Sequence, residues 1–194
     1  MNDVESFKAK LRDVSLNFTI YSELFDEQDA VDIMNNVNPL IFGNYQRCLV
    51  DVLYLEISKL LDPMRQGGNQ NLSFAYIISL VPQQYQQELN SDLSVLVNLF
   101  EQSNLKKYRN KKLAHNDLQS IKSERGIELN ISSSKLENML DCAWLVLGKV
   151  EFYLGLTDRP YKTAVHVRLP TGVTIEEFIS QLGKCTQQIT QVDS

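Results

Sequence analysis

One stretch of this sequence gathers the side chains best suited to chemistry, Tyr108-Arg109-Asn110-Lys111-Lys112-Leu113-Ala114-His115-Asn116-Asp117. It contains one of only two histidines, and five cationic side chains lie between positions 106 and 112. An imidazole has an unperturbed pKa of about 6.5, so it can take up or release a proton near neutral pH. A guanidinium stays charged and can hold two phosphate oxygens at once. Together these groups predict cleavage of a phosphodiester.

RNA can be cleaved without a metal when a base removes the proton of the ribose 2′-hydroxyl and a fixed cation stabilises the charged phosphoryl oxygens. We assign the first role to His115, as general acid/base, and the second to Arg109. Asn110, which could hold a phosphate oxygen or the ribose, is the third predicted catalytic residue. The alternative is a solvated helix end, where the macrodipole favours cations. If the cluster binds RNA, the residues that follow the backbone are Lys106, Lys107, Lys111 and Lys112.

The spacing of Arg109 and His115 raises a geometric difficulty, because residues six apart lie on different faces of a straight helix that turns about 100° per residue. Either the helix breaks near Lys112, or two copies of the motif meet across a two-fold axis. We favour the second arrangement, in which each Arg109 faces the motif of the partner subunit in one shared cleft. The sequence therefore predicts a homodimer.

Other chemistry is less well supported by the sequence. A second Arg and His at similar spacing, Arg159 and His166, enclose Pro160 and enter a strand-like segment, so we reject them as the site. The two histidines stand 51 positions apart without clustered ligand spacing, and we predict no metal site and no cofactor. A nucleophile pair of Cys142 with His115 is disfavoured, because a cysteine within an apolar helix is usually inert.

Composition limits the classes of partner. The chain of 194 residues carries a net charge of −5, the wrong sign for a non-specific nucleic-acid binder, so any RNA contact must be local, through the basic cluster at 106–112. No apolar run approaches the roughly 20 residues of a membrane span. The acidic N-terminus has no apolar signal core. We therefore expect a cytoplasmic protein with no membrane partner.

Apolar residues three and four apart predict the long helices that must position the motif. They cover about 3–25, then 39 or 43 to 61, a stretch from Pro82 toward Tyr108, and 134–154. We predict an all-α fold, an antiparallel bundle of about five helices over residues 1–157, followed by a small accessory segment at 158–194. The stripe of the first helix comprises Val4, Phe7, Leu11, Val14, Phe18, Tyr21 and Phe25.

Local signals mark the ends of these elements. Asn2 is predicted to cap the first helix and Ser73 a short one, while Ser134 forms a capping box with Glu137. Gly155 is predicted to end the last long helix. In the remaining sequence, alternating apolar residues predict short strands at 127–131 and 163–169, and a final helix is expected at 174–182.

Glu56 falls on the apolar stripe of the second long helix, where a carboxylate is costly unless it is paired. One interpretation is that Glu56 orients a catalytic cation such as Arg109. The other is that it lies at the wet edge of the stripe, or pairs with Lys59 or Arg47 for structural reasons. The sequence leaves these alternatives open.

Three stretches together resemble a known family. Arg109-Asn110-Lys111-Lys112-Leu113-Ala114-His115 resembles the R-x(4-6)-H signature of the HEPN superfamily (higher eukaryotes and prokaryotes nucleotide-binding). With Ile57-Ser58-Lys59-Leu60-Leu61-Asp62-Pro63 and Asn71-Leu72-Ser73 in the same order, the motif looks like the abortive-infection AbiU-type branch. The likeness covers about residues 3–157.

The resemblance implies a bundle of four to five helices, a face-to-face dimer, and metal-independent ribonuclease activity used in phage defence or as a toxin. Arg109 and His115 would be catalytic, and Asn110 would be the polar residue after the arginine. An antitoxin or regulatory protein is an expected partner. Because many members of the superfamily bind without cleaving, the alternative is a non-catalytic helical module that binds a partner protein or a nucleotide.

Overall fold

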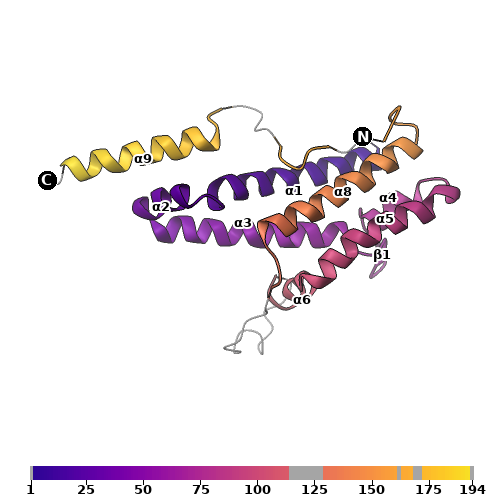
Figure 1. Ribbon diagram of the computed structural model, residues 1–194. Coiled ribbons are helices and arrows are strands. Elements are labelled where there is room, and N and C mark those ends of the chain that lie inside the picture. The colour runs from indigo at the N-terminus through magenta and orange to yellow at the C-terminus, as the bar shows by residue number, and fades with distance from the viewer. Residues whose placement is uncertain (1, 114–128, 161–162, 168–171, 193–194) are drawn as a thin grey trace.

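The computed structural model describes residues 2–113, 129–160, 163–167 and 172–192, with the backbone alone for 112–113 and 186–192 (Figure 1). The predicted all-α bundle is confirmed, since the one sheet in the described residues is a hairpin of two short strands. The elements in chain order are α1 Asp3–Phe25, α2 Gln28–Val37, α3 Pro39–Leu60, β1 Arg65–Gln66, β2 Asn69–Gln70, α4 Phe74–Ser79, α5 Gln83–Gln102, α6 Leu105–Tyr108, the π-helical turn η1 Arg109–Leu113, α8 Ser133–Tyr153 and α9 Ile175–Val192.

Four long helices form the bundle, and successive ones run in alternating directions (Figure 1). α1 packs against α3 and α8, and α5 packs against α8, so that α1 and α8 lie at the centre of the contacts. The predicted stripe of α1 is confirmed: Val4, Phe7, Leu11, Val14 and Phe18 are all buried. Each such side chain contributes roughly 1.5–3 kcal/mol when it is fully buried. The described part of the chain holds no helix with the length and apolar character that crossing a membrane requires.

Two polar contacts, one buried and one partly buried, fix α1 against α8. The indole Nε1 of Trp144 donates to the Ser15 hydroxyl at 2.9 Å, and both side chains are buried. The Glu151 carboxylate, only 3% exposed, is paired with the Lys8 ammonium at 2.7 Å. Because a buried carboxylate without a cation is strongly destabilising, this pair specifies how the two helices align.

The helix ends follow the sequence signals in part. Asn2 caps α1 as predicted, accepting from the Glu5 amide at 2.8 Å, and Gly155, with φ 69°, follows the end of α8. Ser73 is the N-cap residue of α4 as predicted, but its side chain makes no capping hydrogen bond, and its buried hydroxyl has no hydrogen-bond partner within the described residues. The predicted cap of α8 is wrong, because Ser132 caps this helix and Ser134 does not.

The predicted strands are also corrected where the structure describes them. Residues 163–167 form no strand; instead Val165 is buried in the bundle core and the Val167 amide donates to the Thr19 hydroxyl at 3.0 Å. Residues 129–131 are likewise not in a strand. A β-strand needs a neighbour for its backbone groups, and here the bundle side chains supply the contacts instead.

The final helix is longer than predicted and packs outside the main core. Thr174 caps α9 by accepting from the Glu177 amide at 3.1 Å, and α9 continues to Val192 rather than ending near residue 182. It lies beside α2 at one end of the bundle (Figure 1). A separate small apolar cluster holds it there, formed by Leu24, Ala30, Met34, Ile175 and Ile179.

Candidate functional site

The motif follows a break in the chain rather than the end of one continuous helix. α5 ends at Gln102, and Asn104 adopts the left-handed conformation, with φ 62°, which asparagine tolerates better than most residues. α6 then begins at Leu105, which is fully buried and anchors the new direction. The backbone amide of Asn130 donates to the Ser103 carbonyl at 3.2 Å, so the chain returning toward α8 braces the break.

Tyr108, the residue before the predicted catalytic arginine, is held against α3. Its hydroxyl donates to the Asp51 carboxylate at 2.8 Å, and its ring meets the Tyr54 ring edge-on, with centroids 5.7 Å apart. Burial, and then the hydrogen bond to Asp51, raise the pKa of Tyr108 to about 12. Burial also raises the pKa of Tyr54 to about 12. Both phenols are therefore neutral at physiological pH and act as fixed packing groups.

Arg109 is held by the Asp62 carboxylate, which lies just after the C-terminal end of α3. Its Nη1 donates to Asp62 Oδ1 at 2.6 Å, and the two side chains are only 22% and 17% exposed. Asp62 follows α3 directly, at the turn before Pro63. Within the described residues this is the one polar contact of the guanidinium, and it uses one of the five N–H donors. The remaining edge can still face a phosphate.

Glu56 does not pair with Arg109, the cation that the functional interpretation of this carboxylate requires. Its carboxylate pairs with the Lys59 ammonium at 2.6 Å, one turn along α3. The structure thus supports the structural alternative for Glu56, and Asp62 is the carboxylate that contacts Arg109. Asp51 and Asp62 are not among the site residues predicted from the sequence, where Asp62 appears only in the stretch that resembles the family.

The backbone from Arg109 to Leu113 forms a π-helical turn, the class of helix whose defining hydrogen bonds join residues five apart. Such turns are rare and often occur at functional sites. His115 lies outside the described residues, and whether it meets Arg109 within one chain or across two stays a prediction.

The predicted RNA-binding lysines are distributed unevenly around this turn. Lys106 and Lys107 on α6 are exposed, as is Asn110, whereas Lys111 is half-buried. For Lys112 the structure describes the backbone alone. The second Arg–His pair differs in setting: the exposed His166 approaches Glu137, with 3.3 Å between Nε2 and Oε1, and its ring lies 5.5 Å from that of Phe18. His166 is thus a surface residue of the bundle.

Comparison with protein families places these features. The AbiU2 family model of HEPN domains matches residues 3–167. This chain belongs to the AbiU2 family. The matched region runs from the first turn of α1 through α8 and includes the whole Arg–His motif, while α9 lies beyond it. No curated protein and no solved structure matches the chain.

Proposed function

We propose that this AbiU2-family protein is a metal-independent endoribonuclease that acts in phage defence or as a toxin. The observation that supports the proposal most directly is the fixed orientation of the Arg109 guanidinium. Among the described residues, Asp62 is the one polar partner of its guanidinium and binds a single nitrogen, in a turn that also carries the exposed Asn110. A cation that is oriented in advance, with donors left over, is what stabilising a phosphoryl transition state requires.

In the proposed reaction, the imidazole of His115 removes the proton of the 2′-hydroxyl while that oxygen attacks the adjacent phosphorus. The P–O5′ bond breaks as the new O2′–P bond forms, leaving a 2′,3′-cyclic phosphate. The departing O5′ takes a proton from an imidazolium, so that one proton is removed and one is returned. Arg109 stabilises the charge on the non-bridging oxygens, and Asn110 holds one of them or the ribose.

We further propose that two copies build the cleft across a two-fold axis. Each Arg109 would then act with His115 of the partner subunit. This arrangement avoids the requirement that residues six apart converge within one helix.

Incubation of the purified protein with total RNA in the presence of EDTA tests the activity. We expect cleavage by the wild type, and its loss in Arg109→Ala and His115→Ala with the dimer intact by light scattering. The matched control is the second Arg–His pair, because Arg159→Ala and His166→Ala remove the same side chains at similar spacing and should leave cleavage unchanged. Absence of cleavage by the wild type, alone and in extracts of infected cells, would favour the non-catalytic binding module.

Mixed dimers test whether the cleft is shared. Co-expression of Arg109→Ala with His115→Ala under two affinity tags yields dimers that carry one mutation on each chain. A cleft that takes Arg109 from one chain and His115 from the other keeps one intact site in such a dimer, so about half the activity should return. If each chain completes its own site, both sites are broken and no activity returns.

A further inference from the structure

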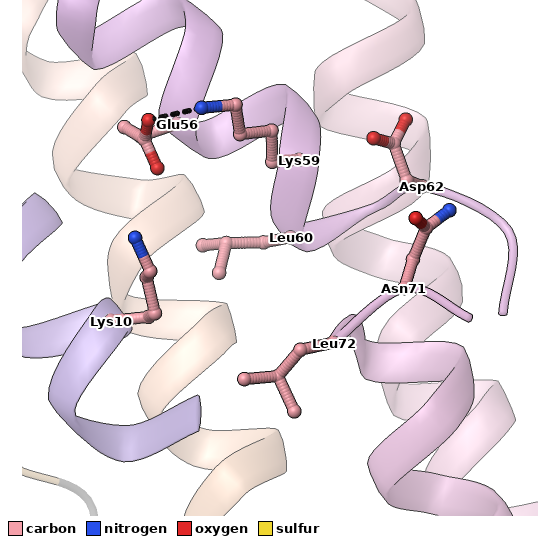
Figure 2. Close-up of a pocket in the computed structure, with 7 residues that line it drawn as sticks. All are labelled: Lys10, Glu56, Lys59, Leu60, Asp62, Asn71 and Leu72. Atoms are coloured by element: carbon pink, nitrogen blue, oxygen red, sulfur yellow. Dashed lines mark hydrogen bonds and ion pairs between the residues drawn. The ribbon is translucent and has the colours of Figure 1, made fainter. Parts of the chain in front are cut away.

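A pocket of about 290 Å³ lies between α1 and the C-terminal end of α3, and the segment after the β1–β2 hairpin closes one side (Figure 2). This volume is just below the range for small-molecule sites, about 300–1,000 Å³. It suits a group no larger than a single nucleotide. The residues that line it are Lys10, Glu56, Lys59, Leu60, Asp62, Asn71 and Leu72.

The pocket combines an apolar surface with a cation. Leu60 and Leu72 point into its middle from two different segments (Figure 2). Lys59 is already paired with Glu56, whereas Lys10 has no ion pair within the described residues. The Asn71 amide nitrogen donates to the Pro63 carbonyl at 2.8 Å, which leaves the side-chain oxygen as an acceptor. An apolar plane with one anionic group and hydrogen-bond donors at its edge matches these features, and a nucleoside phosphate has them all.

Asp62 joins this pocket to the motif. Its carboxylate lines the pocket and also accepts the hydrogen bond from Arg109 Nη1 at 2.6 Å. A group in the pocket is therefore separated from the guanidinium by one carboxylate. Lys10 on α1 and Lys59 on α3 also line this pocket, and Arg109 on η1 contacts its Asp62 carboxylate, so a polyanionic strand could pass from one cation to the next.

We propose that this pocket is a nucleotide subsite for an RNA strand, in which the base next to the scissile phosphate lies against Leu60 and Leu72 and its own phosphate contacts Lys10. The inference rests on the proposed function for its choice of RNA and for the role of Arg109. A free nucleotide shares the same chemistry, and the two sources differ in whether the affinity grows with the length of the strand.

The test is equilibrium binding of a fluorescein-labelled hexaribonucleotide, 2′-O-methylated so that it cannot be cleaved, measured by anisotropy in EDTA over a range of salt concentrations. Lys10→Ala should weaken binding about tenfold, as expected for a lost charge-assisted contact. It should also reduce the slope of log K against log salt by about 0.7, the value for one phosphate contact on a single strand. Leu72→Trp, which fills the pocket without changing charge, should weaken binding at every salt concentration.

Arg12→Ala is the matched control. Arg12 lies on the same helix as Lys10, is exposed and does not line the pocket, so the substitution removes one cation without touching the subsite. Its affinity and salt slope should match those of the wild type. Circular dichroism melting verifies that each variant is folded. Wild-type affinity in both Lys10→Ala and Leu72→Trp would overturn the subsite, as would equal weakening in Lys10→Ala and Arg12→Ala.

Titration with adenosine 5′-monophosphate, followed through the leucine methyl signals in NMR, separates the two sources. If Leu60 and Leu72 respond to the hexamer at far lower concentration than to the mononucleotide, the strand is the ligand; equal affinities would overturn this part of the proposal. The outcomes for cleavage are independent. If the wild type cleaves RNA but the pocket variants bind RNA as the wild type does, the subsite proposal alone is rejected. If the pocket variants bind RNA more weakly but the wild type cleaves none, the nuclease proposal alone is rejected.

Discussion

Replacing Asp62 by alanine removes the carboxylate that lies 2.6 Å from Arg109 Nη1. The arginine side chain is then no longer held in one orientation and can adopt other rotamers. Both side chains are about one-fifth exposed, 22% and 17%, so the pair lies between a surface salt bridge and a buried one. Hydrogen bonds to charged groups contribute roughly 1.5–3 kcal/mol. If about 2 kcal/mol of this orientation is used in the transition state, kcat/KM for RNA cleavage should fall about 30-fold.

Initial rates on a fluorogenic RNA, measured in EDTA, provide the assay. Because Asp62 acts through Arg109, most of the loss should appear in kcat, and Asp62→Asn, which keeps an acceptor for Arg109, should recover part of it. Asp158→Ala, an exposed carboxylate outside the site, controls for the change in net charge and should have no effect.

The comparison with Glu56→Ala decides between the two carboxylates. Glu56 contacts Lys59 rather than Arg109, so its removal should not reproduce the loss in kcat. An equal loss in Glu56→Ala and Asp62→Ala would refute the assignment. A faster reaction in Asp62→Ala would refute it more directly, since it would mean that Asp62 competes with the phosphate for the guanidinium.

Three further predictions concern the scaffold. The pKa of Tyr108 is raised from 10.0 to about 12 in the folded protein. The stability that the neutral phenol contributes is therefore complete below about pH 10 and is lost as the pH rises through 12. In urea titrations, Tyr108→Phe should lose less stability than the wild type between these two pH values. Lys8→Ala leaves the buried Glu151 carboxylate without its cation and should lower the free energy of unfolding by about 3 kcal/mol, measured by urea denaturation at pH 7. Ile179→Asp puts a charge into the small cluster under α9 and should accelerate amide exchange in α9 while leaving α5 and α8 protected.

Much of the bundle could be predicted from the sequence, because amphipathic periodicity is a local property. The spacing of apolar residues in α1 fixes which face is buried, whatever it packs against, and all five of its leading members are buried. Asn38 followed by Pro39 illustrates the same point at a boundary. The Asn38 side chain accepts from the amides of Leu40 and Ile41, both at 3.1 Å, and proline begins α3 with its φ already fixed.

Caps and strands were less predictable because several local solutions compete. Ser132 and Ser134 can both cap a helix. The structure has Ser132 as the cap, with its hydroxyl accepting from the Lys135 amide, while the Lys135 ammonium donates to the Asn130 carbonyl just before it. The alternation of apolar and polar residues at 163–167 is typical of a strand, but no neighbouring strand exists in the described bundle to pair with this segment. Val165 is buried among the helices instead.

The types of the catalytic candidates were set by the sequence: an arginine, an asparagine, a histidine and their lysine neighbours in one short stretch. Their surroundings were decided by tertiary structure alone. Arg109 meets Asp62 across 47 positions and Tyr108 meets Asp51 across 57, and no periodicity within either segment encodes such a contact. These pairings depend on where the break at Ser103–Asn104 sends the chain and on how the π turn then packs on α3, because side chains distant in sequence become partners only when their helices share a core.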